Sequence, residues 1–144
     1  MQVAALVHDI GLMGLADPIV RQRPDDTPHA ARIQYEQHPI IGQSMLSAVE
    51  QLVEIGTWIR HHHERWDGHG YPDRLPGPAI PLPSRIIALA DGYLEAVGCE
   101  GGTAPRWRSA QRAAGAFDPD LVEVLAAELG EMPTEAPPSE TESP

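Results

Sequence analysis

Three consecutive histidines, His61, His62 and His63, end an apolar segment, and a turn rich in glycine and proline follows them. Neutral imidazole is the commonest metal ligand that proteins use. This run constrains the fold more than any other feature of the chain. A metal site that uses these histidines needs further ligands, and these must come from other parts of the sequence.

Other candidate ligands stand at or near the ends of predicted helices. His8 and Asp9 lie in an apolar run, His38 precedes a proline, and Asp91 ends the segment IIALAD. A carboxylate at position 91 would be buried, and a buried charge must be paired or must bind a metal. Helical proteins build metal sites from side chains that project inward from several helices. We therefore predict a metal site of two carboxylates and several histidines.

Oxygen and imidazole ligands without thiolate suit iron, manganese or another divalent ion. Cys99 is the single cysteine, which excludes an internal disulfide and a thiolate site. Asp9 could bridge two ions, which suggests a pair about 3.5–4 Å apart. Such a pair lowers the pKa of a bridging water and holds the oxygens of an in-line displacement at phosphorus. The predicted chemistry is phosphoester hydrolysis.

The charge balance excludes several classes of partner. The net charge is −11, and all ten basic residues are arginines. Such a chain is not expected to bind DNA, RNA or an anionic membrane, which require a basic surface. It contains no apolar run of about 18 residues, so no membrane span is expected. The first residues lack the pattern of a signal peptide, which predicts a cytoplasmic protein.

Apolar spacing predicts an all-α fold without strands or repeats. In the first predicted helix, Val3, Leu6, Val7 and Ile10 share the inward face. Residues 67–83 hold five prolines and three glycines, which predicts a long ordered loop. Ser84 is the predicted N-cap of the helix that follows, with Ile86, Ile87, Leu89 and Ala90 inward. The predicted helices cover residues 2–10, 30–37, 40–48, 50–65, 84–97, 107–114 and 119–129, the last capped by Asp118, and 11–29 is an irregular connection.

Residues 1–130 are predicted to form one domain, and the acidic, proline-rich residues 131–144 a disordered tail. The first predicted helix begins at Met1 without an N-cap. We therefore expect the domain to lack its first helices.

Five segments resemble the HD-GYP family in order and spacing, over about residues 3–125: VHDIG, QHPIIGQSML, HHERWDGHGYP, IPLPSRIIALAD and AFDPDLVEVL. The resemblance implies an HD-domain-like helical bundle with a long ordered loop. It also implies two or three iron or manganese ions and hydrolysis of cyclic di-GMP by a metal-activated hydroxide. The metal ligands that it implies are His8, Asp9, His38, His62, His63 and Asp91, with Asp9 as the bridge and His8 and Asp9 as catalytic residues.

The same resemblance assigns the signature loop to Gly70, Tyr71 and Pro72. In the family this loop lines the substrate site and also contacts partner proteins, such as a GGDEF-type cyclase. Arg85 matches a family arginine near the substrate. His61 matches no ligand position.

The chain departs from the family where phosphate would bind. Leu12 replaces a family lysine, and Glu95 and Glu100 stand where neutral or basic residues would help a phosphate. A further histidine, on a helix upstream of the HD pair in the family, has no counterpart. Three hypotheses follow: a cyclic di-GMP phosphodiesterase, a degenerate domain that acts as a binding or regulatory module, and a phosphohydrolase for another phosphoester.

Overall fold

The structure is a computed structural model that describes residues 1–20, 28–100 and 115–130, apart from the side chains of residues 97–100. Within these ranges every regular element is a helix, and the one extended pairing is an isolated bridge between Asp67 and Pro76. The predicted all-α class is therefore confirmed. The elements are α1 (Gln2–Val7), the 3-10 helix η1 (Ile10–Gly14), α2 (Asp17–Val20), α3 (His29–Tyr35), α4 (His38–Leu46), η3 (Glu50–Leu52), α5 (Val53–Arg60), η4 (Gly77–Ala79), α6 (Leu82–Glu100) and α8 (Pro119–Glu128).

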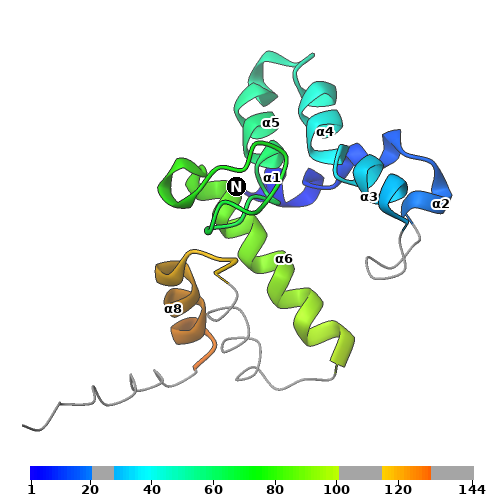
Figure 1. Cartoon of the computed structure of the whole chain (residues 1–144). Coiled ribbons are helices and arrows are strands. Elements are labelled where there is room, and N and C mark those ends of the chain that lie inside the picture. Colours follow the sequence, from blue (N-terminus) through cyan, green and yellow to red (C-terminus); the bar gives the residue numbers. More distant parts are fainter. Residues whose placement is uncertain (21–27, 101–114, 131–144) are drawn as a thin grey trace, which may run out of the picture.

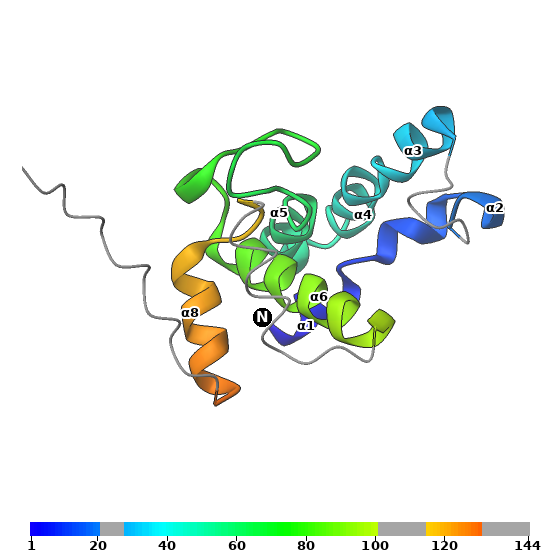
Figure 2. The same ribbon diagram turned by 60° about the horizontal axis from the view of Figure 1, so that its bottom comes forward.

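Helices α4 and α5 lie side by side, and the long helix α6 runs away from them, with α8 packed beside it (Figure 1). α1 packs on α5, while η1 packs on α4. The loop between α5 and α6 arches over the junction of these helices (Figure 2). None of the described helices is long and apolar enough to cross a membrane.

In the described part of the chain, two clusters of apolar side chains form the core. The first joins α1, α4, α5 and α6 through the buried side chains of Ala4, Leu46, Ile59 and Ile87. The second joins α6 to α8 through Leu89 and Val122. α6 contributes to both clusters, because its residues 87 and 89 lie on different faces of the helix. It therefore connects the N-terminal helices to α8.

A close contact of two glycines sets the distance between η1 and α4. A methyl group at Gly11 would lie 2.7 Å from the backbone nitrogen of Gly42 and 2.8 Å from the carbonyl carbon of His38. Only a residue without a side chain fits here. This contact brings Asp9, two residues earlier, next to the first residue of α4.

Several predicted helix ends differ from the structure. α5 ends at Arg60 and not at residue 65, so that His61, His62 and His63 lie in the turn after it. α4 begins at His38, because Pro39 in its first turn needs no hydrogen-bond donor there. The connection predicted as irregular over 11–29 contains η1 and α2.

The prediction of Ser84 as an N-cap is wrong. α6 begins at Leu82, and the Ser84 hydroxyl lies inside the helix, where it donates a hydrogen bond to the carbonyl of Trp58 at 2.7 Å. Asp118 is the N-cap of α8 as predicted, and its side chain accepts from the backbone N–H of Asp120 at 3.0 Å. The predicted helix at 107–114 and the tail at 131–144 lie outside the described residues.

Three apolar side chains do not face inward as predicted. Val3 is 50% exposed and Leu6 is 85% exposed, because α1 packs on α5 through the face that carries Ala4 and Val7, which turns Leu6 to solvent and leaves Val3 at the edge of the contact. Ala90 is exposed too, since α6 turns Ile87 and Leu89 toward the two clusters.

Candidate metal centre

Asp9 lies between two groups of side chains, and each of its carboxylate oxygens faces one of them. Oδ1 lies 3.4 Å from Nε2 of His38 and 3.6 Å from Nε2 of His62. His63 belongs to the same group, since one ligand atom from each of these four residues lies within 4.8 Å of the others. We call His38, His62 and His63 the first group.

The second group consists of His8 and Asp91. Nε2 of His8 lies 3.5 Å from Oδ2 of Asp9 and 3.9 Å from Oδ1 of Asp91. The two oxygens of Asp9 therefore face different sets of ligands. This is the arrangement that a carboxylate bridging two ions requires.

Backbone carbonyls orient three of the imidazole rings. Nδ1 of His8, His38 and His62 lies 2.8, 2.8 and 2.6 Å from the carbonyl oxygen three residues earlier. A carbonyl only accepts, so Nδ1 carries the proton in each ring. The lone pair of a neutral ring is then on Nε2, which faces Asp9. Such hydrogen bonds fix the tautomer and orientation of metal-ligating histidines.

The donor set fits divalent cations. The Nε2 atoms of His38, His62 and His63 are buried and have no hydrogen-bond partner among the described residues. Burial, followed by the neighbouring histidines, lowers the pKa of His63 to about 2, so this ring is neutral. Burial acts to raise the pKa of Asp9, but the nearby imidazoles of His38 and His62 outweigh it and hold that pKa well below its usual range. Neutral imidazole and ionised carboxylate are the forms that bind metal.

The ends of helices supply most of these ligands. His8 follows the last residue of α1, His38 begins α4, and His62 and His63 lie in the turn after α5. Asp91 comes from the middle of α6. A helix end leaves backbone carbonyls without intrahelical partners. The rings of His8 and His62 use such carbonyls at the ends of α1 and α5.

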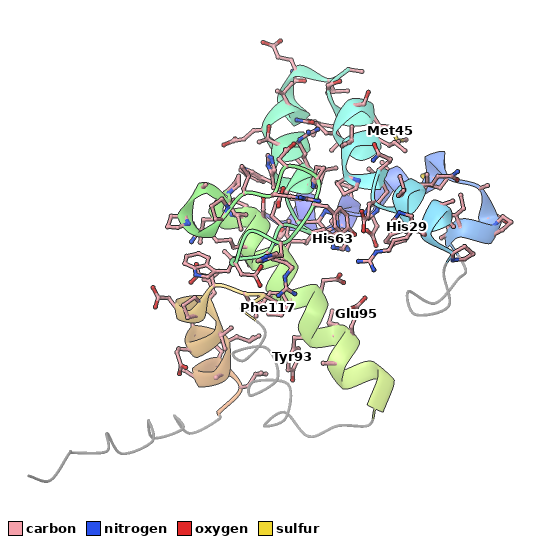
Figure 3. All side chains as sticks on the ribbon, in the orientation of Figure 1. His29, Met45, His63, Tyr93, Glu95 and Phe117 are labelled. Carbon is pink, nitrogen blue, oxygen red and sulfur yellow. The ribbon has the colours of Figure 1, made fainter. Side chains whose placement is uncertain are left out.

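A cleft of about 430 Å³ opens beside the first group and Asp91. Its far side is formed by Glu95, Ala96 and Phe117, and Figure 3 shows Glu95 on α6 below His63. Burial, together with the carboxylates of Asp91 and Asp9, raises the pKa of Glu95. Among the described residues, one arginine lines the cleft, Arg65, and it is ion-paired with Asp67 at 2.6 Å. The cleft is therefore acidic on its α6 side.

Tyr71 of the predicted signature loop lies against the first group. Its ring stacks on that of His63 with 4.9 Å between centroids and 26° between planes. With Gly70 and Pro72 it also lines a second cavity, of about 600 Å³, between the loop and the α3–α4 region. The Tyr71 ring therefore contacts the ligand group and also lines the second cavity.

Arg85 lies apart from the ligands. Its guanidinium donates to Oδ2 of Asp118 at 2.6 Å and lies 5.6 Å from the centre of the Trp66 ring. Leu12 is half-buried in η1. Nε2 of His61 lies 2.9 Å from Oδ2 of Asp73, on the loop side of α5 and not among the ligands.

Sequence reasoning missed two carboxylates that hold the loop. Glu64 is 4% exposed and accepts hydrogen bonds from the backbone N–H groups of Asp73, at 2.7 Å, and Leu75, at 3.1 Å. Asp73 receives two hydrogen bonds from Arg60, both at 2.7 Å. The sequence did mark Glu64 as a residue near the site, because it directly follows the histidine run. Nothing in the sequence shows that it is buried.

Comparisons with known proteins bear on the family of the chain. The sequence profile of the HD domain family matches residues 1–120. The "Cyclic di-GMP phosphodiesterase response regulator RpfG" of Xanthomonas campestris pv. campestris is 38% identical over 95 residues, which are 65% of this chain and 25% of that protein. "Cyclic di-GMP phosphodiesterase PA4108" of Pseudomonas aeruginosa is 33% identical over 141 residues, 93% of this chain and 34% of that protein. "3'3'-cGAMP-specific phosphodiesterase 1" of Vibrio cholerae is 37% identical over 93 residues, 65% of this chain and 21% of that protein. The chain spans about a quarter of the length of these curated relatives.

Proposed function

The chain belongs to the HD domain family, in its HD-GYP branch, and on that premise we propose that it is a metal-dependent phosphodiesterase that hydrolyses cyclic di-GMP. We further propose that two divalent ions, iron or manganese, are its cofactors. His38, His62 and His63 would hold one ion, and His8 and Asp91 the other, with Asp9 as the bridge. The observation that carries the proposal is the position of Asp9, whose two oxygens face two separate groups of ligands.

A pair of divalent ions at this place would supply positive charge that polarises a phosphodiester and makes the attacking water more acidic. The residues of the chain prepare the site. Carbonyl hydrogen bonds hold His8, His38 and His62 with Nε2 toward Asp9. The low pKa of Asp9 keeps its carboxylate charged over the neutral pH range. The site therefore needs little rearrangement to bind ions.

The cleft supports a substrate of nucleotide size. It begins at His62 and His63 and ends at Phe117, whose ring offers an apolar surface to a base. The phosphate would have to lie at the ligand end, since Glu95 makes the α6 side acidic. The names of three relatives above, all phosphodiesterases for cyclic dinucleotides, support this substrate class.

The test is hydrolysis of cyclic di-GMP by protein purified without oxygen and loaded with Fe²⁺ or Mn²⁺. We expect formation of the linear dinucleotide or GMP, abolished in Asp9→Asn and retained in Glu54→Gln, which removes an exposed charge on α5. 3'3'-cGAMP is assayed in parallel. Turnover of that substrate alone would reassign the substrate within the same chemistry. Folded, metal-loaded protein that turns over neither substrate would refute the proposal and favour a binding or regulatory role.

A further inference from the structure

His63 differs from the other histidines of the metal centre in how its ring is held. His8, His38 and His62 each have Nδ1 against a backbone carbonyl, as described above. In the described parts of the chain, no hydrogen bond of the His63 ring is found, and its Nε2 is buried without a partner. A ligating histidine normally donates its other ring N–H to a partner, which fixes its orientation. Something else must orient this ring.

Ring contacts take the place of that hydrogen bond. The His63 ring stacks on Tyr71 with 4.9 Å between centroids, and it also lies 4.0 Å from the ring of His62 and, edge-on, 4.9 Å from the ring of His38. His62 and His38 are already held by backbone carbonyls. Tyr71 therefore decides whether the outer face of the His63 ring is covered or free. The position of Tyr71 depends in turn on the loop that carries it.

The loop is bound to its own starting point. The backbone N–H of Tyr71 donates to the carbonyl of His63 at 3.2 Å. Gly70 passes so close to this turn that a methyl group there would lie 2.5 Å from Cα of Glu64 and 2.6 Å from the carbonyl oxygen of His63. The stretch between His63 and Tyr71 thus folds back on itself. The part of the loop that follows Pro72 must be held in place by another contact.

Glu64 provides that contact and anchors the loop. Its carboxylate accepts from the N–H groups of Asp73 at 2.7 Å and Leu75 at 3.1 Å, one with each oxygen. The side chain is 4% exposed, and the hydrogen bonds from the two N–H groups offset the loss of hydration of the buried carboxylate. Asp73 is fixed a second time from α5, through Arg60 and through His61 at 2.9 Å. The residues on either side of His62 and His63 therefore hold the segment that follows Tyr71.

We propose that Glu64 is a positioning residue of the metal centre: it anchors the loop so that Tyr71 packs on His63 and aims the imidazole of this ligand at the ion. This inference rests on the metal centre that the proposed function requires, and it adds a residue that does not itself bind the ion. His61, the one member of the histidine run outside the ligand group, supports the same anchor through Asp73.

The proposal is tested by metal affinity, measured as free Mn²⁺ by electron paramagnetic resonance during titration of the whole chain. Glu64→Gln keeps the size of the side chain but places an amide N–H against a backbone N–H. Tyr71→Leu removes the ring and leaves the anchor in place. We expect each variant to weaken binding of the more loosely held ion by about 10–100-fold, the effect typical of lost outer-shell support. Tyr71→Phe, which keeps the ring, and Glu54→Gln, the control on α5, should bind as the wild type does.

The double variant Glu64→Gln/Tyr71→Leu distinguishes positioning from general destabilisation. If Glu64 acts through Tyr71, the double variant binds Mn²⁺ no more weakly than the weaker single variant. Multiplied losses would overturn the proposal, and so would wild-type affinity in folded Glu64→Gln. If Glu64→Gln does not fold, wild-type affinity in folded Tyr71→Leu still overturns it. Hydrolysis of cyclic di-GMP is measured separately. Mn²⁺ binding that depends on Glu64 and Tyr71, without turnover, would refute the proposed function alone.

Discussion

Substitution of Gly11 by alanine should weaken both the fold and the metal centre. The added methyl would overlap the carbonyl oxygen of His38 and lie 2.7 Å from the nitrogen of Gly42, where ordinary contact begins at 3.4 Å. All of these atoms belong to the α4 backbone, so no side chain can rotate away. η1 and α4 must separate by at least about 0.7 Å, the difference between 2.7 and 3.4 Å, to relieve the contact.

The expected magnitude follows from that displacement. Overpacking in a closely packed core costs about 1–3 kcal/mol, and a clash with backbone lies at the upper end of the range. With a urea m-value of about 2 kcal/mol per M, a loss of about 2–3 kcal/mol lowers the unfolding midpoint by about 1–1.5 M. Ligand atoms must be placed within about 0.5 Å of their working positions. The same displacement would increase the 3.4 Å distance between Asp9 and His38 beyond this tolerance.

The assay combines urea unfolding of metal-free protein with Mn²⁺ titration of folded protein. Gly14→Ala is the matched control in the same helix, because its methyl would meet the side chain of Ile41, at 2.9 Å, which can move. We expect a smaller loss of stability and unchanged Mn²⁺ affinity in the control. Gly11→Ala with a midpoint within about 0.3 M of the wild type, and with the same affinity, would refute the packing argument.

Three further predictions concern the core, pH and the cleft. Ile59→Ala should lose about 2–4 kcal/mol in urea unfolding, because Ile59 is fully buried in the first cluster, and a loss below about 1 kcal/mol would contradict its place there. Hydrogen bonds from Arg60 lower the pKa of Asp73 from 3.8 to about 2. The ionised side chain therefore adds about 1 kcal/mol to the free energy of unfolding, after a discount for its exposure. This contribution is complete above the unfolded pKa and is lost as the pH falls through 2. Asp73→Asn should therefore be less stable than the wild type near about pH 6, and the difference should shrink toward zero as the pH falls below about 2, whereas a constant difference would rule out the ion pair as the cause. Glu95→Ala and Glu95→Gln should both lower the KM for cyclic di-GMP, by about 10-fold at low salt, because each removes a negative charge from the cleft, and a higher KM would show that Glu95 binds substrate.

Local features of the sequence were sufficient to predict much of the architecture. Apolar spacing identified the helices, and Asp118 before a proline identified the start of α8. The chemistry of side chains identified the candidate ligands, because histidines and carboxylates within apolar segments need partners. Asp9, His38, His62 and His63 do lie together.

Errors arose where a contact between distant residues overrides a local preference. Ser84 is a residue type that often caps helices, but its hydroxyl donates a hydrogen bond to the carbonyl of Trp58, 26 residues away in the chain. Arg85, whose role near the substrate stays a prediction, is also placed by a distant residue, because Asp118, 33 residues away, pairs with its guanidinium. Apolar periodicity predicted that Val3 and Leu6 face inward, but α1 packs on α5 through Ala4 and Val7, and Val3 and Leu6 are exposed.

The sequence by itself determined the class of fold and the residue types of the candidate centre, because helix periodicity and the demand of a buried charge for a partner are local properties. The tertiary structure alone decided which oxygen of Asp9 faces which histidines, and that the loop returns to stack Tyr71 on His63. These arrangements depend on the approach of η1 to α4 and on the capture of the loop by Glu64. The first is a contact between two backbone segments, and the second joins a side chain to a distant backbone segment. The identity of a side chain does not reveal where another backbone will pass.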